Sequence, residues 1–287
     1  MIWQTTRFQI DLSRVRVMGI VNVTPDSFSD GGQHDSAAAA LAHCERLLAD
    51  GADMLDIGGE SSRPGAKPIS AKEELARLLP VLQGAVQLGC PVSVDTTKPE
   101  VMQSVLDLGA DIVNDINALR DPLALSSVSA HAACGVCLMH MRGLPASMQA
   151  QPAYADVVSE VAAFLRQRAK LLGLHGVSAQ RVVFDPGIGF GKSVEHNVEL
   201  LKRQRELVAL GRPLLVGWSR KSTLGFITGR GVALREAASV AAALAAVQHG
   251  ARILRVHDVA ATVDALKVWQ SAGLGSETIR AQENDHR

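Results

Sequence analysis

Polar and ionisable side chains follow short aliphatic and β-branched runs at eight places along the sequence. In chain order these places hold Asn22, Glu60 with Ser61-Ser62-Arg63, Asp95, Asn114-Asp115, Met139-His140, Asp185, Ser219-Arg220-Lys221, and Arg255 with His257. Parallel strands that alternate with helices bring their carboxyl ends to one edge, where ligands bind. If the eight runs are strands, these side chains share one site.

The expected site has two chemical halves. Asp95, Asn114 and Asp185 offer carboxylates and an amide, which suit a neutral ligand rich in N–H donors, such as an amino-pyrimidinone edge. In a chain of zero net charge, the other half indicates an anion site; it consists of Asn22, Arg63, Arg220, Lys221, Arg255 and His257. Taken singly, the acids could instead be N-caps or Asx turns, and the cations solvated surface groups.

Apolar runs alternate with segments of helical periodicity from one end of the chain to the other. The sequence predicts strands at 15–21, 54–57, 92–95, 112–114, 136–140, 182–185, 214–217 and 253–256. Eight such units in 287 residues are typical of a (β/α)8 TIM barrel of the α/β class. A doubly wound sheet shows the same alternation, but rarely eight strands without a dinucleotide fingerprint. We expect a single barrel over 15–274, an N-terminal extension over 1–14 that forms a plug or hairpin, and a frayed polar tail over 275–287.

Three signals mark predicted helix starts. Ser70 with Glu73 and Thr97 with Glu100 predict capping boxes, and Asp121-Pro122 predicts an N-cap followed by proline at the first helical position. The clearest helical face is made by Val157, Val161, Phe164, Leu165, Leu171 and Leu172.

Composition excludes several classes of protein. Lysine plus arginine and aspartate plus glutamate both number 29, and aromatic residues make up 3% of the chain, so neither a basic field nor a stacking platform for nucleic acid is expected. The longest apolar run, Val240 to Val247, is far shorter than the roughly 20 residues of a membrane span. No signal-peptide pattern is seen at the N-terminus, which predicts a cytoplasmic protein. The four cysteines are expected to be small buried hydrophobes.

The segment Gly187-Ile-Gly-Phe-Gly-Lys-Ser193 ends like a phosphate-binding loop. A Walker A motif needs glycine where Pro186 stands, and the dinucleotide spacing fails as well, because the third glycine is Gly191. We expect these glycines to let backbone approach a ligand on the Asp185 side. A Schiff base on Lys221 is a weaker alternative, because this lysine follows its strand among other cations.

Eight segments, in order, resemble the bacterial dihydropteroate synthases over nearly the whole chain. They are MGIVNVTPDSFSDGG (18–32), DIGGESSRPGA (56–66), VSVDTTKPEV (92–101), ADIVNDI (110–116), CLMHM (137–141), FDPGIGFGK (184–192), GWSRKS (217–222) and RVHDV (255–259). The resemblance implies a Mg²⁺-dependent condensation of dihydropterin-CH₂-diphosphate with 4-aminobenzoate, giving dihydropteroate and diphosphate for folate synthesis. It also implies inhibition by sulfonamides and a homodimer formed through the outer helices after strands six to eight.

The resemblance also implies a role for each matching residue. The pterin would contact Asp95, Asn114, Asp185, Lys221 and Met139, and Mg²⁺ would bind Asn22. The diphosphate would contact Ser62, Arg63, Arg255 and His257, and the aminobenzoate Pro64, Phe190, Lys221 and Ser222, with Gly217 and Arg220 also in the substrate site. Asp95, Asp185, Lys221 and Arg255 would take part in catalysis, together with Asp35 in a loop that excludes water.

Departures from the family pattern are small. Ser62 stands where threonine is usual, Trp218 replaces a smaller residue, and Asn117 stands where larger residues are common. Trp218 is expected to alter packing near the aminobenzoate. Two alternatives are a pterin-dependent methyltransferase domain and a pterin-binding paralogue without turnover. The first would ordinarily lack Ser219-Arg-Lys-Ser222, and the second would have lost a loop residue such as Arg63 or Asp35.

Overall fold

Eight parallel strands form the centre of the molecule. The computed structural model describes residues 1–24, 33–62, 65–145, 147–150 and 152–274, with the backbone alone for 33–35. The strands are hydrogen-bonded in the order β8-β7-β6-β5-β4-β3-β10-β9. Their bounds are β3 (Arg16–Asn22), β4 (Met54–Gly58), β5 (Val92–Asp95), β6 (Ile112–Asp115), β7 (Gly135–Met139), β8 (Val182–Asp185), β9 (Leu215–Val216) and β10 (Ile253–Val256).

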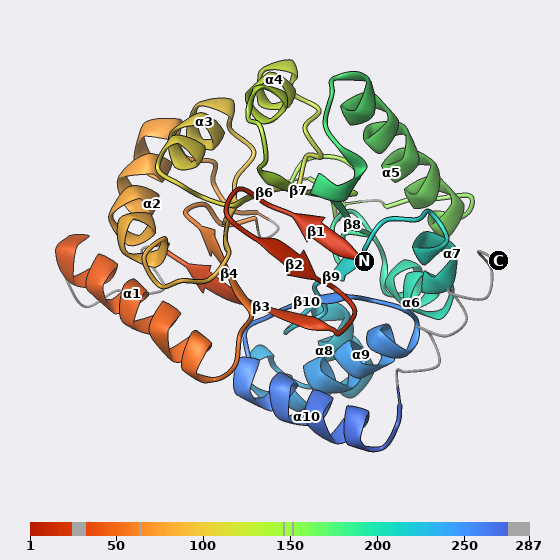
Figure 1. Ribbon diagram of the computed structural model, residues 1–287. Helices are drawn as coiled ribbons and strands as arrows, with labels where there is room; N and C mark the ends of the chain where they lie inside the picture. Colours follow the sequence, from red (N-terminus) through yellow and green to blue (C-terminus); the bar gives the residue numbers. More distant parts are fainter. Residues whose placement is uncertain (25–32, 63–64, 146, 151, 275–287) are drawn as a thin grey trace.

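The sheet closes on itself between β8 and β9. A parallel bridge joins Phe184 to Leu214, and the Phe184 N–H donates to the carbonyl of Pro213 at 2.9 Å. Helices surround the strands, as Figure 1 shows. They are α1 (Gln33–Ala49), α2 (Ala71–Ala85), α3 (Pro99–Asp107), α4 (Pro122–Ala130), α5 (Val157–Leu174), α6 (Val194–Lys202), α7 (Gln204–Val208), α8 (Ser222–Thr228), α9 (Glu236–Gln248) and α10 (Val259–Ser271), with short 3₁₀ turns η2 (Ala179–Arg181) and η3 (Val232–Leu234). The predicted (β/α)8 barrel is confirmed.

Two of the three helix-start predictions are confirmed. Ser70 and Glu73 form a capping box at α2, and the Asp121 carboxylate accepts from the Leu123 N–H at α4. The predicted box at Thr97 is wrong, because α3 begins at Pro99 and its N-cap is Lys98, whose extended backbone suits a residue before proline. On α5 the predicted apolar residues are buried or partly buried against the core.

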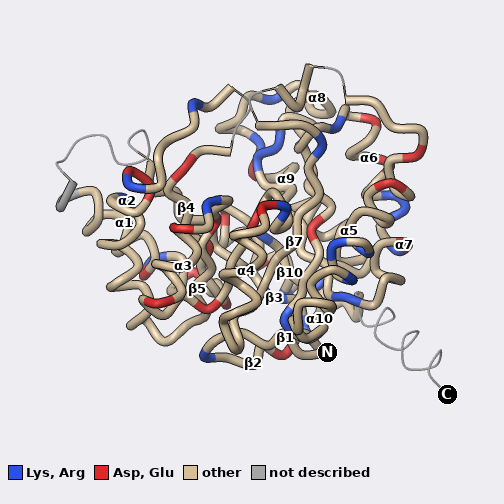
Figure 2. Tube along the Cα trace, turned by 90° about the horizontal axis from the view of Figure 1, so that it is seen from above, with Lys and Arg blue, Asp and Glu red and all other residues tan. Residues whose placement is uncertain are grey.

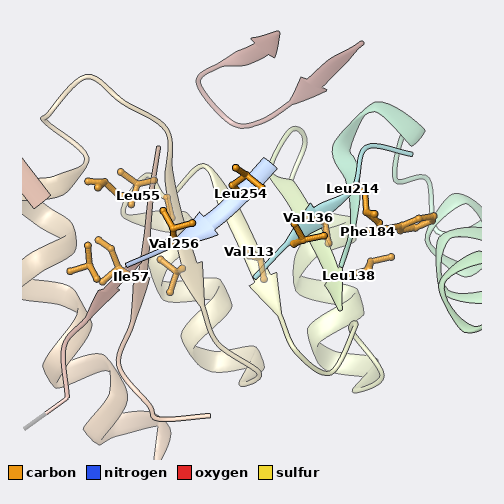
Figure 3. Close-up of a cluster of buried hydrophobic side chains, with 14 of the residues drawn as sticks. Leu55, Ile57, Val113, Val136, Leu138, Phe184, Leu214, Leu254 and Val256 are labelled. Atoms are coloured by element: carbon orange, nitrogen blue, oxygen red, sulfur yellow. The ribbon is translucent and has the colours of Figure 1, made fainter. Parts of the chain in front are cut away.

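Apolar packing fills both sides of the strand layer. The larger cluster lies between strands and helices; Figure 3 shows part of it, including Leu55, Val113, Val136 and Phe184. A second cluster fills the barrel interior at the amino ends of the strands, with Met18, Met54, Ile112, Cys137, Val183, Leu215 and Ile253. The interior is therefore mainly apolar at one end, and the ionisable side chains of the predicted site lie at the other end.

A hairpin of β1 (Ile2–Gln4) and β2 (Gln9–Asp11) covers the apolar end of the barrel. Trp3 is fully buried in the interior cluster, and its indole N–H donates to the Arg181 carbonyl at 2.9 Å. In Figure 2 the hairpin lies at the opposite end of the molecule from α8, and positive and negative residues are interspersed. Among the described residues, no helix combines the length and apolar character that a membrane crossing requires. All four cysteines are free and buried, as predicted.

Replacing Trp3 tests how much its indole contributes to the stability of the apolar end of the barrel. Trp3→Ala is expected to lower the free energy of unfolding by about 3–5 kcal/mol, because it opens a cavity and leaves the Arg181 carbonyl unpaired. Urea unfolding would measure the change. Trp269→Ala on α10 is the matched control, since that indole is only partly buried. Equal losses in the two variants would contradict a special role for the hairpin.

Candidate active site

Arg255 joins two carboxylates across the polar end of the barrel. Its Nε donates to Oδ2 of Asp56 at 2.6 Å, and its Nη2 donates to Oδ2 of Asp95 at 3.0 Å. The Asn114 amide donates to the same Asp56 oxygen at 3.1 Å. These residues come from β10, β4, β5 and β6, and Asp95 lies directly opposite Asn114 in the β5–β6 ladder. Barrel closure is what brings them together.

The sequence analysis missed Asp56. Its side chain is fully buried, and its second oxygen, Oδ1, has no hydrogen-bond partner among the described residues. A carboxylate within the apolar strand Met-Leu-Asp-Ile-Gly is a recognisable signal, because buried acids are rare unless they are paired. The sequence places Arg255 in the anion half, whereas the structure places it between Asp56 and Asp95, the second of which belongs to the predicted carboxylate-and-amide half. The two expected halves therefore share this guanidinium.

Burial shifts the pKa values of the ionisable side chains at the polar end of the barrel, which we call the mouth. It raises the pKa of Asp95 to about 7, although Arg255 opposes the shift. Burial also raises the pKa of Asp185, which Gly187 N–H and Lys221 oppose. Burial and the charge of Arg255 lower the pKa of Lys221 to about 8. Poor solvation thus makes these groups sensitive to any ligand that supplies hydrogen bonds or charge.

Lys221 and Phe190 form the wall of the site next to Asp185. The Lys221 ammonium lies 4.3 Å from the centre of the Phe190 ring, a cation–π contact. Asp185 accepts from the Gly187 N–H at 2.7 Å, which ties this acid to the loop that carries Phe190. Met139 is buried beside them in a small cluster with Ile116, Met141 and Met148, against which Phe190 packs.

The glycines of the 187–191 loop pack against backbone. Gly187, Gly189 and Gly191 all have positive φ. A Cβ on Gly187 would collide with the His140 carbonyl, and one on Gly191 with the Arg142 carbonyl. The backbone of this loop thus approaches the backbone of the segment after β7 closely. This contact explains why glycine is needed here without a bound phosphate.

His257 and Arg220 differ from the cationic cluster expected from sequence. Burial and Arg255 lower the pKa of His257 to about 3, so its ring is neutral, and Nδ1 lies 3.0 Å from the Ser219 hydroxyl. The Arg220 guanidinium donates to Asp258 and is 45% exposed. Arg220 has φ of 58°, and its carbonyl accepts from Arg235. Among the predicted cations that the structure describes, Lys221 and Arg255 are therefore the ones that bring positive charge into the site.

Other predicted residues lie around this mouth or outside the described part. Asn22 ends β3 and pairs in register with Gly58, which in turn lies opposite Asp95. Ser62 is half-buried after β4, Gly217 follows β9, and Ser222 is the first residue of α8. Arg63 and Pro64 lie outside the described residues, as does the side chain of Asp35 in the first turn of α1. Trp218 is buried in the core between strands and helices.

Behind the loop after β4, an ion-pair cluster was not foreseen from sequence. Lys98 Nζ donates to Glu60 Oε2 and Glu74 Oε2, both at 2.5 Å, and Glu74 is fully buried. Glu60 Oε1 accepts from the Ile69 N–H at 2.9 Å, so this residue spans the loop between its two ends. The cluster fixes the base of the segment that contains Ser62.

Comparisons with known proteins agree with this geometry. Residues 18–257 match the profile of the family described as "Pterin binding enzyme". A dihydropteroate synthase of Neisseria meningitidis serogroup C is 52% identical over 277 residues, covering 95% of this chain and 98% of the relative.

Solved structures give the same result. Xanthomonas albilineans dihydropteroate synthase in complex with 7,8-dihydropteroate has 49% identity and a TM-score of 0.84, covering 92% of this chain and 96% of that one. The same protein with 4-aminobenzoic acid gives 52% identity and a TM-score of 0.87, with coverage of 92% and 95%. The Yersinia pestis dihydropteroate synthase in complex with a sulfonamide drug has 42% identity and a TM-score of 0.89, covering 95% of this chain and 99% of that one. The chain belongs to the pterin-binding enzymes and, within them, to the dihydropteroate synthases.

Proposed function

We propose that this enzyme joins the methylene carbon of a dihydropterin-CH₂-diphosphate to the amino nitrogen of 4-aminobenzoate. The C–N bond forms, the C–O bond breaks, the diphosphate leaves with the electron pair, and the amine loses one proton. The observation that carries the proposal is the single mouth in which Asp56, Asp95, Asn114 and Arg255 meet, with Asp185, Phe190 and Lys221 beside it. Relatives of this chain hold both 4-aminobenzoic acid and dihydropteroate.

The chain's own groups suit a reaction in which the leaving group departs early. An aromatic amine is a weak nucleophile, so positive charge builds on the pterin methylene before the C–N bond is complete. We assign Asp95 and Asp185 to the pterin, where buried carboxylates favour that charge, and Asn114 to its hydrogen-bonding edge. Arg255 and Lys221 are partly buried cations next to these acids, and we assign them to the departing diphosphate and the pterin carbonyl.

We assign the remaining predicted residues by resemblance. Phe190 and Ser222 would line the aminobenzoate side, with Pro64, and sulfonamides would compete there, as the Yersinia pestis complex suggests for this family. His257, neutral in the free protein, would donate from its ring to a diphosphate oxygen, together with Ser62 and Arg63. The roles of Arg63, Pro64 and Asp35 stay predictions.

We propose that a Mg²⁺ ion arrives with the diphosphate. Among the described residues, no group of three or more His, Cys, Asp or Glu side chains could hold a metal ion. Mg²⁺ commonly takes one or two protein oxygens together with substrate phosphates and water. We propose the Asn22 amide oxygen at the end of β3 as its protein ligand. When bound, the ion would neutralise charge on the leaving diphosphate.

Two further properties are proposals of the same kind. A homodimer is supported by exposed apolar side chains on consecutive elements: Phe226 and Ile227 on α8, and Val232 and Leu234 on η3, are all more than half exposed. Exposed apolar surface of this kind commonly marks a protein–protein contact. A cytoplasmic location stays a prediction.

Turnover is the decisive test of the proposed function. Purified protein with Mg²⁺ and dihydropterin-CH₂-diphosphate is expected to release diphosphate and form dihydropteroate only when 4-aminobenzoate is present. A chelator should stop the reaction, and a sulfonamide should compete with 4-aminobenzoate. Pterin binding without product would favour the silent paralogue, and methyl transfer from a methylated pterin would favour the methyltransferase alternative.

The ionisation of Asp95 is expected to appear in pterin binding. Burial raises the pKa of this acid to about 7, so the carboxylate gains a proton as the pH falls from 8 to 6 and accepts fewer N–H bonds from the ligand. Calorimetry with a dihydropterin that lacks the diphosphate should show weaker binding at the lower pH. In Asp95→Asn this pH dependence should become smaller, with a remainder from the titration of Lys221. Asp258→Asn, which alters the Arg220 pair instead, should retain it; identical profiles in wild type and Asp95→Asn would contradict the assignment.

Substitutions of Arg255 and of Arg220, its matched control, test which arginine binds the diphosphate. Arg255→Gln is expected to raise the KM for the diphosphate substrate by at least about tenfold, because it removes a partly buried charge that is hydrogen-bonded to two carboxylates. Arg220→Gln removes an arginine that already pairs with Asp258 near the surface and should change this KM much less. Steady-state kinetics would measure both constants. Equal effects of the two substitutions would argue against placing Arg255 at the diphosphate.

A further inference from the structure

The lysine of the glycine-rich segment is buried, and its amine forms hydrogen bonds with backbone carbonyl groups. Lys192 is 3% exposed and follows the 187–191 loop immediately before α6. Its Nζ lies 3.0 Å from the Gly187 carbonyl oxygen and 3.1 Å from that of Phe190. Lys192 Nζ also contacts the segment that follows β7: it lies 2.9 Å from Nδ1 of His140 and 3.2 Å from the carbonyl oxygen of that residue. The amine thus joins both ends of the loop to the residue that follows β7.

The chemistry of this contact is unusual for a buried amine. The four acceptors are neutral, and burial lowers the pKa of Lys192 to about 7, against the opposing effect of Asp185. Burial and the charge of Lys192 lower the pKa of His140 to about 2, so this ring is neutral and Nδ1 can accept. The protonated amine has three N–H groups for these four acceptors, and the contacts to Gly187 and His140 are buried. Losing it would remove this donor from the His140 and Phe190 carbonyls, which is unfavourable in a buried place, whereas the Gly187 carbonyl would keep the Phe190 N–H as a donor.

The loop that Lys192 holds forms one wall of the active site. Phe190 lies over the Lys221 ammonium, and a Cβ on Gly189 would meet the Lys221 side chain at 3.3 Å. The Gly189 N–H donates to Asn197 Oδ1 at 2.9 Å, and the Asn197 amide donates to Thr223 in α8 at 2.9 Å. The position of the loop therefore determines where Phe190 and Lys221 stand relative to each other.

We propose that Lys192 is a positioning residue for the aromatic amine substrate. By holding the Gly187 and Phe190 carbonyls against His140, it keeps the Phe190 ring in place beside Lys221. This inference rests on the proposed function, because Phe190 is assigned to the aminobenzoate side. It also gives a role to the segment that resembles a phosphate-binding loop: the lysine binds backbone instead of phosphate.

Kinetics of Lys192→Met test the proposal, because methionine keeps most of the side-chain volume and removes every N–H donor. We expect the KM for 4-aminobenzoate to rise about tenfold, as for loss of hydrogen bonds from a charged group, and the KM for the diphosphate substrate to change far less. Lys192→Gln, which keeps two N–H donors at shorter reach, should give an intermediate KM. It also carries the test if Lys192→Met does not fold.

Arg181 provides the matched control at the other end of β8. It is also buried and donates to backbone, with Nε 2.7 Å from the Cys134 carbonyl oxygen and Nη2 3.0 Å from that of Val128. Arg181→Met should lower the thermal midpoint and leave both KM values unchanged. If Arg181→Met and Lys192→Met alter the two KM values in the same proportion, Lys192 is merely structural and the proposal is overturned.

Hydrogen–deuterium exchange separates this inference from the proposed function, because it needs no turnover. In Lys192→Met the amides of 187–191 should exchange faster than in wild type, whereas in Arg181→Met they should not. The proposal would be overturned if the amides of 187–191 exchanged at the same rate in Lys192→Met as in wild type. An unchanged KM for 4-aminobenzoate in an active Lys192→Met enzyme would overturn it as well. Absence of product from the wild-type enzyme would instead refute the proposed function, and the exchange result would still decide whether Lys192 holds the loop.

Discussion

The guanidinium of Arg255 depends on carboxylates from two other strands, and the polar end of the barrel is arranged around it. Burial alone would lower the pKa of this arginine, but Asp56 and Asp95 raise it, so it stays charged where water is scarce. Removing one partner from such a cluster leaves another charge uncompensated. The site is therefore a set of mutually dependent charges rather than a collection of independent contacts.

The closed barrel makes that arrangement possible by separating two environments. At the amino ends of the strands, Trp3 and the side chains of the interior cluster fill the barrel with apolar atoms. At the carboxyl ends, side chains from β4, β5, β6 and β10 point toward one another and exchange hydrogen bonds. The rigidity of the apolar end supports precise placement at the polar end, because short strands in a packed core cannot shift register cheaply.

Loops complete the site, and buried polar groups hold them. Lys192 and Asn197 fix the loop after β8, and Lys98 with Glu60 and Glu74 fixes the base of the loop after β4. In both places a charged or amide side chain from a helix start binds a segment beside the mouth. Loops commonly contribute to function on a rigid scaffold, and here these anchors hold the loops beside the side chains that the strands supply.

The strand order, the barrel and most of the polar residues at the strand ends could be predicted from the amino-acid sequence, because hydrophobic period and turn chemistry are local properties. The family could be recognised as well, since eight segments match it in order. The contacts between polar groups could not be predicted: Arg255 lies between Asp56 and Asp95, Arg220 pairs with Asp258, and burial keeps His257 neutral. The Thr97 capping prediction failed for a local reason, because α3 begins at Pro99. The roles of Asp56, Lys98 and Lys192 are a different case. Pairing and desolvation depend on residues distant in the chain, and only the closed barrel brings these together.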